Sequence, residues 1–298
     1  MSHVIELKVI QFVQQFKNPI FDAFFSFLDL FDRHEFFFVV IPAFWLGKGW
    51  KTGLRLFYIL FLSSFTNHLL KAIFLSPRPF HLDPTLGIIK VAGYGFPSGA
   101  AQTVILLSGL LMTHWKSKWK CFIAFMYIFL VSFSRIYLGV HFPTDIIAGW
   151  MVGFGLLAFY AYVRPPIEKY LKKLPPLSLL LVSQLVPLLL IFLQKSYSVF
   201  SIGGCAIGMG MGLFINNSYG CYLSPSKTNK ESTLRVLIGV WGTFICYFLI
   251  SKVLSPDCYI AICLKFIVLG LWVATGSLLI CRQFLRSSDH QIKVKEDG

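Results

Sequence analysis

The sequence predicts an all-α fold, a polytopic bundle of transmembrane helices. Of its 298 residues, 56% are hydrophobic and 17% aromatic, and only 13% are charged, whereas a soluble protein carries roughly 25% charged residues. Several apolar runs are long enough to cross a hydrocarbon layer of about 30 Å. The polar residues gather in short islands between these runs, as expected where a chain leaves a membrane.

The basic residues fit a membrane protein better than a nucleic-acid-binding protein. The formal net charge of +14 could indicate nucleic acid, but the lysines and arginines are scattered through short loops. A positive-inside topology explains that distribution, so no nucleic-acid partner is expected. The seven cysteines lie mostly within apolar segments and lack CxxC or Cys/His spacing. We interpret them as small hydrophobic residues, not as metal ligands or a disulfide framework.

Residues 1–35 are predicted to form amphipathic helices that lie in the membrane interface. Over residues 1–17, apolar side chains recur at helical spacing, with polar side chains such as Glu6, Lys8 and Gln11 opposite them. Asn18-Pro19 ends this helix. A Phe-rich piece follows over residues 20–31. The charge cluster at 32–35 is interpreted as a solvated cap at the membrane surface.

The next part of the chain, residues 36–164, is predicted to be a membrane core of about five spans. A long polar connection at 76–97 follows the second span, and a basic loop at 114–120 follows the third. The expected spans are residues 36–46, 54–75, 98–112, 121–132 (continuing as helix to 138) and 142–162.

A basic linker rich in proline, residues 165–176, is the best candidate for a domain boundary. Beyond it, residues 177–285 are predicted to add four spans, followed by a cytoplasmic tail at 286–298. The expected spans are 177–193, 199–215, 234–254 and 259–281.

Two features of these added spans invite an interpretation. Gly204, Gly208 and Gly212 form a ridge of small residues that favours close helix packing within the chain and leaves a homo-oligomer as the alternative. Lys265 could snorkel, pair or line a polar cavity, and snorkelling is the favoured interpretation.

The distribution of lysine and arginine predicts the orientation. The loops near residues 48–55, 116–120, 164–173 and the C-terminal tail carry more of them than the loops on the other face. The first face is therefore expected to be cytoplasmic, and the face with the 76–97 connection is expected to be periplasmic or exterior. An odd number of spans puts the N-terminus on that exterior face, in what we expect to be a bacterial inner or cell membrane.

Three polar islands at span ends emerge on this same face if the apolar segments cross the membrane alternately. Each has a fixed pattern: Lys71, six residues, then Arg78-Pro79; Pro97-Ser98-Gly99-Ala100; and Ser134-Arg135, five residues, His141, three residues, Asp145. Three cations around a histidine that is backed by a carboxylate suit a phosphate bound for nucleophilic attack.

These three motifs together resemble the type 2 phosphatidic acid phosphatase (PAP2) superfamily, over residues 18–164. That superfamily includes membrane lipid phosphatases, glucose-6-phosphatases and vanadium haloperoxidases. The resemblance implies a PAP2-like core of five spans, with the four later spans as an addition. It implies no cofactor and no metal, because cations supply the charge and the sequence has no carboxylate cluster.

The chemistry assigns a role to each motif residue. His141 is the candidate nucleophile that would hold a phosphoryl group, and Asp145, one helical turn later, would orient its ring. Lys71, Arg78 and Arg135 would neutralise the phosphate oxygens. Ser98 and Gly99 would bind phosphate at the N-terminus of the helix that follows.

Residue 100 departs from the family pattern, which reads Pro-Ser-Gly-His. That histidine is expected to protonate the leaving oxygen, and loss of a general acid typically costs about 10²–10⁴-fold in rate. Because every other motif position is intact, we favour a substitution made to disable turnover over a natural pseudoenzyme. An active variant whose leaving group needs little protonation is the third possibility.

The predicted function is that of an integral membrane phosphatase that hydrolyses a lipid phosphomonoester or pyrophosphate, impaired at Ala100. The substrate candidates that the resemblance implies are undecaprenyl pyrophosphate, phosphatidic acid, phosphatidylglycerol phosphate, sphingoid-base phosphate and lipid A phosphates. A lipid phosphotransferase using the same site is one alternative, and a non-catalytic lipid-binding or transport protein is the other.

Overall fold

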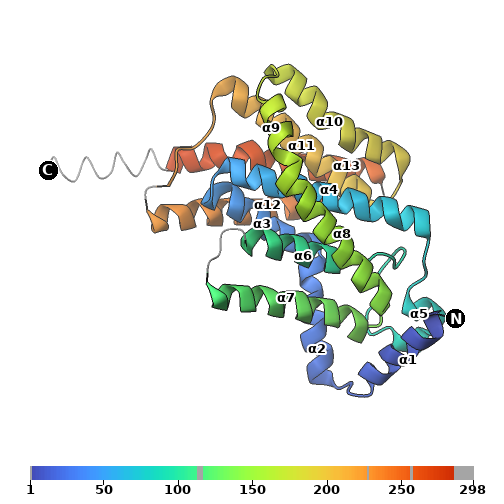
Figure 1. The fold of residues 1–298 in the computed structure, drawn as a ribbon. Coiled ribbons are helices and arrows are strands. Elements are labelled where there is room, and N and C mark those ends of the chain that lie inside the picture. Colours follow the sequence, from blue (N-terminus) through green and yellow to red (C-terminus); the bar gives the residue numbers. More distant parts are fainter. Residues whose placement is uncertain (1, 113–116, 227, 256–257, 285–298) are drawn as a thin grey trace. The chain divides into compact units, whose positions relative to one another are not determined.

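The computed structural model describes residues 2–112, 117–226, 228–255 and 258–284, and every regular element in this part of the chain is a helix (Figure 1). Seven of these helices are long and apolar enough to cross a membrane. The predicted fold class is therefore confirmed. The predicted tail at 286–298 and residues 114–116 of the predicted basic loop lie outside the described residues.

Contacts divide the chain into two compact units, of which the first contains all the motif residues. This unit consists of Met1–Phe36 and Leu62–Glu168. The domain boundaries expected at 35/36, 164/165 and 176/177 stay predictions. Its helices are α1 (Ser2–Gln14), α2 (Pro19–Leu28), a 3-10 turn (Asp29–Asp32), the second half of α4 (Trp50–Phe74), α5 (Pro79–Leu82), a 3-10 turn (Pro84–Leu86), α6 (Gly99–Met112), α7 (Lys118–Tyr137), α8 (Pro143–Tyr162) and most of α9 (Arg164–Leu171).

Two of the nine expected spans are shorter than a bilayer requires. Both α3 (His34–Gly47) and α6 are apolar helices of 14 residues. At 1.5 Å per residue such a helix is about 21 Å long, short of the roughly 30 Å of a hydrocarbon core. Apolar composition therefore predicted where these helices form, but seven helices, not nine, meet the length of a complete span.

In the first unit, α6 packs against both α7 and α8 (Figure 1). Two glycines of α8 make the approach to α6 close. A Cβ atom at Gly149 would lie 2.5 Å from the carbonyl oxygen of Ser98, and one at Gly153 would lie 2.8 Å from that of Gln102. This packing brings the N-terminal ends of α6 and α8 together, which joins the second and third motifs.

The N-terminal helices form where the sequence predicts them and dock on α7. Phe25 and Leu28 of α2 share a buried cluster with Tyr137, Leu138 and Val140. Two polar side chains of α1 also reach the core. Their contacts are Glu6 Oε1 accepting from the Thr144 amide at 2.9 Å, and Gln14 Nε2 donating to the carbonyls of Leu86 (2.8 Å) and Tyr137 (2.7 Å).

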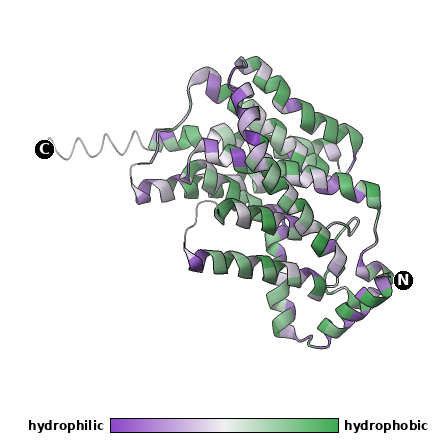
Figure 2. Ribbon diagram, viewed as in Figure 1, coloured by the Kyte–Doolittle hydropathy of each residue, from purple (hydrophilic) through white to green (hydrophobic). Residues whose placement is uncertain are grey.

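The second unit, Phe37–Phe61 and Lys169–Gly298, contains the C-terminal helices. Apolar residues run along the whole length of α10 (Pro176–Leu193) (Figure 2). The other elements of the second unit are most of α3, the first half of α4, α11 (Tyr197–Tyr219), α12 (Asn229–Val253) and α13 (Tyr259–Leu271). The last of these continues through a π-helical turn (Trp272–Gly276) to Phe284.

The glycine ridge of α11 packs against α13 of the same chain. A Cβ atom at Gly204 would lie 2.5 Å from the Cys263 carbonyl oxygen, and one at Gly212 would lie 2.5 Å from the Ala274 Cβ. The interpretation as a packing surface within the chain is thus the one that the structure bears out.

Lys265 lies against aromatic side chains of its own unit. Its ammonium group is 4.5 Å from the centre of the Tyr247 ring and 3.4 Å from the Ser251 hydroxyl, and the expected snorkelling stays a prediction. The face of an aromatic ring stabilises the cation there.

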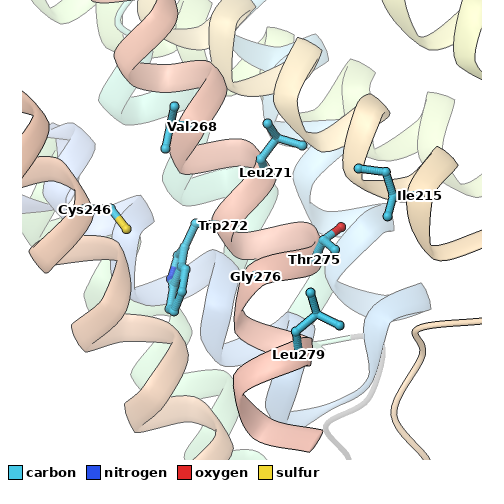
Figure 3. Close-up of a pocket in the computed structure, with 8 residues that line it drawn as sticks. All are labelled: Ile215, Cys246, Val268, Leu271, Trp272, Thr275, Gly276 and Leu279. Atoms are coloured by element: carbon cyan, nitrogen blue, oxygen red, sulfur yellow. The ribbon is translucent and has the colours of Figure 1, made fainter. Parts of the chain in front are cut away.

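A wide-open apolar pocket of about 260 Å³ lies beside the π-helical turn (Figure 3). Trp272, Thr275 and Leu279 of this last helix line it, together with Ile215 of α11 and Cys246 of α12. Asn216 of α11 also contacts this turn, since its side-chain nitrogen donates to the Ala274 carbonyl at 2.8 Å.

Candidate active site

His141 lies between a carboxylate and a guanidinium group. Its Nδ1 is 3.2 Å from Asp145 Oδ2, and its Nε2 is 3.3 Å from Arg78 Nη1. A guanidinium nitrogen only donates hydrogen bonds. Nε2 therefore accepts with its lone pair, and the ring proton is on Nδ1, where it is donated to Asp145. All three side chains are buried.

The local sequence explains this geometry. Pro143 begins α8, and Asp145 follows in its first turn, where the Oδ2 atom accepts from the Phe142 amide at 2.9 Å. A proline at this position needs no hydrogen-bond acceptor, and an acidic residue in the first turn is favoured by the helix dipole. His141 lies four residues before Asp145 in the turn that joins α7 to α8, and Gly139 allows that turn with φ of +69°.

The surroundings of His141 keep its ring neutral. Burial, followed by the positive charges of Arg78, Lys71 and Arg135, holds the pKa of His141 well below its usual value. A neutral ring with an unprotonated Nε2 is the form that attacks phosphorus.

Arg78 is fixed by backbone carbonyls as well as by the histidine. Its guanidinium group donates to Gly93 (2.9 Å), Ala92 (3.3 Å) and Val140 (3.0 Å). Pro79 begins α5 directly after it. Arg78 therefore joins the 76–97 connection to the turn that carries His141.

Arg135 is near the end of α7 and pairs with a carboxylate that the sequence analysis did not select. Its Nη1 donates to Asp29 Oδ1 at 2.7 Å, and Asp32 Oδ2 lies 3.7 Å from the same nitrogen. Asp29 is only 6% exposed. The charge cluster at 32–35, interpreted as a solvated cap, therefore includes a residue close to the site. An acidic residue within the Phe-rich piece was the signal in the sequence.

Lys71, at the end of α4, completes the group of cations. It interacts electrostatically with Arg78 and with the carboxylates of Asp32 and Asp145. The structure thus brings Lys71, Arg78 and Arg135 to the surroundings of one histidine.

Ser98 precedes α6, as an N-cap residue would. Its Oγ accepts from the Ala101 amide at 3.4 Å, and its own amide donates to the Asp145 carbonyl at 3.0 Å. Gly99 begins the helix, and a Cβ atom there would lie 3.2 Å from Asn67 Oδ1. Asn67 in turn donates to the Pro97 carbonyl at 3.2 Å, so α4 supports the motif that α6 carries.

Ala100 is buried in an apolar cluster with Val104 and Val131. Phe31 and Tyr127 pack against the same cluster. The position at which the family pattern has histidine is therefore enclosed by apolar side chains in this chain.

Gly95 is a second residue that the sequence analysis missed. A Cβ atom there would lie 3.2 Å from Asp145 Oδ2 and 3.0 Å from the Pro77 carbonyl oxygen. Only a glycine fits between the first and third motifs without displacing one of them. In the described part of the chain, no cluster of three or more His, Cys, Asp or Glu side chains is placed to hold a metal ion.

Curated relatives of this chain are phosphatases. The chain is 35% identical over 108 residues to an undecaprenyl-diphosphatase from Sulfolobus acidocaldarius, which covers 35% of this chain and 50% of the relative. It is 24% identical over 177 residues to lipid phosphate phosphatase delta from Arabidopsis thaliana, covering 53% of this chain and 42% of the relative. The chain thus spans about half the length of these relatives.

A solved structure was also found, the transmembrane PAP2 type phosphatidylglycerolphosphate phosphatase from Bacillus subtilis. It is 22% identical, with a TM-score of 0.47, and the match covers 56% of this chain and 87% of that one.

Two family models match the two parts of the chain in order. Residues 52–169 match the PAP2 superfamily, and residues 200–288 match the transmembrane extension of PAP2 superfamily phosphatases. Together the matches cover well over half of the sequence and agree with the three motifs and with the seven apolar helices. The chain belongs to the PAP2 superfamily and carries the transmembrane extension of PAP2 superfamily phosphatases.

Proposed function

We propose that this chain acts on a lipid phosphomonoester or pyrophosphate through a phosphohistidine at His141. The observation that carries the proposal is the pair of contacts on one imidazole. Asp145 accepts a hydrogen bond from Nδ1–H, and Arg78 faces Nε2, so a neutral nucleophile lies beside a phosphate-binding cation.

In the first step, the Nε2 lone pair attacks the terminal phosphorus and the bond from phosphorus to the leaving oxygen breaks. That oxygen is the lipid ester oxygen in a phosphomonoester and the bridging oxygen in a pyrophosphate, where a lipid monophosphate leaves. The ring becomes positively charged, and Asp145 stabilises that charge through the Nδ1–H bond. Lys71, Arg78 and Arg135 offset the charge on the phosphate oxygens. The departing oxygen keeps the bonding electrons and needs a proton.

In the second step, water attacks phosphorus and the bond from phosphorus to Nε2 breaks. Phosphate leaves, and the imidazole recovers its lone pair and its neutral state. The burial and cations that lower the pKa of His141 favour this return.

We propose that turnover is slow because Ala100 supplies no proton to the leaving oxygen. Solvent must then provide it, at a cost of about 10²–10⁴-fold in rate. Binding of the phosphate is expected to persist, because the cations and the start of α6 are complete.

The names of the relatives support a lipid-linked phosphate or diphosphate as the substrate class. The excess of basic residues in the loops on the other face supports a site that faces the periplasm or the cell exterior.

A phosphate-release assay on the detergent-purified chain tests the proposal. The panel contains undecaprenyl pyrophosphate, phosphatidic acid, phosphatidylglycerol phosphate and a sphingoid-base phosphate, each measured with the chain and with His141→Ala. Slow release that His141→Ala abolishes supports hydrolysis. Transfer of phosphate to a second lipid without release would support the phosphotransferase. Binding with neither reaction, even after histidine is restored at residue 100, would support a binding or transport protein.

A further inference from the structure

Two of the three guanidinium nitrogens of Arg135 form hydrogen bonds within the protein, and the third is available to a ligand. Nε donates to Ser134 Oγ at 3.2 Å, and Nη1 donates to Asp29. Nη2 is buried and has no hydrogen-bond partner among the described residues. A buried donor without a partner is costly in a folded protein unless a ligand takes it.

Two arginine side chains hold the Asp29 carboxylate in place. Its Oδ1 accepts from Arg135, and its Oδ2 accepts from Arg33 Nε at 2.8 Å. The carboxylate lies at the start of a 3-10 turn that directly continues α2. Since both oxygens are occupied, Asp29 cannot swing away without losing a charge-assisted hydrogen bond.

We infer that Asp29 is a positioning residue that fixes the guanidinium plane of Arg135, so that Nη2 is presented to the phosphate. This inference rests on the proposed function. Asp29 does not touch the substrate itself. It prevents rotation of a long side chain, and an arginine held in one orientation loses less entropy when it binds an anion.

The residue that positions Arg135 comes from a part of the chain outside the catalytic family match. That match begins at residue 52, and Asp29 and Arg135 are 106 positions apart. The N-terminal helices therefore contribute to the phosphate site as well as to packing.

A purely structural role is the competing explanation, because Asp29 also helps to hold α2 against α7. Asp22 provides a matched control. It lies on α2, the helix that the turn of Asp29 continues. Its Oδ1 accepts from the hydroxyl of Tyr137, two residues beyond Arg135 on α7, at 2.7 Å. Asp22→Ala removes a similar contact between the same helices without touching the guanidinium group.

The test measures the affinity of the full-length, detergent-purified chain for orthovanadate and for inorganic phosphate. Asp29→Ala is expected to weaken binding at least about tenfold, the scale of one charge-assisted hydrogen bond. Asp22→Ala is expected to change it less than about twofold. In an Arg135→Ala background, Asp29→Ala should have no further effect, because the group that it positions is gone.

Should Asp29→Ala not fold, Asp29→Asn keeps the shape and removes the charge, and it should weaken binding in the same Arg135-dependent way. Equal effects of the Asp22 and Asp29 variants, or effects of Asp29 and Arg135 variants that simply add, would overturn the positioning role alone. A parent chain that binds neither anion would overturn the proposed function, and the positioning role with it.

Discussion

Arg78 Nη1 lies 3.3 Å from His141 Nε2. Because the guanidinium group cannot accept a hydrogen bond, this contact requires a proton-free Nε2. One cation thereby selects the tautomer that the proposed mechanism needs. In that mechanism the same guanidinium group would also bind the phosphate oxygens.

Asp145→Asn should reduce phosphate release by about 10²–10⁴-fold, measured in an Ala100→His background where turnover is faster. The amide removes the charge that stabilises the phosphorylated ring and can donate to Nδ1, which would favour the wrong tautomer. Undiminished release by a folded Asp145→Asn chain would contradict the role given to this carboxylate.

Ala100→His should raise the rate of phosphate release, and His141→Ala in the same chain should abolish the gain. Since Val104 and Val131 enclose residue 100, the new ring is crowded, and overpacking costs roughly 1–3 kcal/mol. Val131→Ala combined with Ala100→His makes room for it. If neither variant gains activity while both bind phosphate, the missing proton donor at residue 100 does not explain the slow turnover.

The pH dependence of stability should carry a signature of His141, whose folded-state pKa is lowered. Above about pH 6.5 the imidazole is neutral in the folded and unfolded chains alike. Below that pH the unfolded chain binds a proton that the folded chain does not, so the free energy of unfolding falls. The slope approaches about 1.4 kcal/mol per pH unit for one proton.

Thermal unfolding of the parent chain and of His141→Gln, followed from pH 7.5 downwards, gives the slope of the free energy of unfolding against pH for each chain. The difference between the two slopes is the contribution of His141. Identical slopes would show that His141 titrates normally. A phosphatase rate that declines as the pH falls, with an apparent pKa near the ordinary value for histidine, would also show that His141 titrates normally.

Gly149→Ala should damage the site, because its new Cβ would lie 2.5 Å from the Ser98 carbonyl oxygen. The backbone there cannot yield without moving the start of α6, and we expect a loss of roughly 1–3 kcal/mol in stability together with weaker phosphate binding. Gly155→Ala on the same helix is the control, since no atom lies within 4 Å of its Cβ position. A similar outcome for both variants would mean that helix propensity, not contact, sets the result.

Single cysteines test the orientation, which requires that α6 crosses the membrane together with α7 and α8 despite its 14 residues. Lys90→Cys lies in the 76–97 connection, and Ile167→Cys lies in α9, both at exposed positions. An impermeant thiol reagent added to intact cells should label the first and spare the second, in a background without the seven native cysteines. The opposite pattern would place the site on the cytoplasmic face.

The motif residues could be selected from the sequence because each motif has a short, fixed spacing. The structure places Lys71, Arg78, Arg135, His141 and Asp145 in one unit, and their catalytic and binding roles stay predictions. Asp29 was missed because its partner is 106 positions away, and no short sequence spacing indicates such a pair. Gly95 was missed for a similar reason. It matters because it has no side chain at a point where two motifs that are distant in the sequence come close together.

Helix lengths were the weaker part of the prediction. Apolar runs located α3 and α6, and the expected ranges of 36–46 and 98–112 were already short. The error was to count two helices of 14 residues as complete spans. The surroundings of Ala100 were equally inaccessible, because the valines that enclose it come from α6 and from α7.

The contact between Asp29 and Arg135 has a consequence for exchanging parts between related enzymes. A chimera that joins the first 33 residues of another phosphatase to this catalytic core would inherit the motifs intact and still lack the carboxylate that holds Arg135. Grafts of this kind should succeed only where the donor segment ends in an acid at the equivalent turn. The leading helices and the catalytic core are therefore one module for the purposes of recombination, although they are far apart in the sequence.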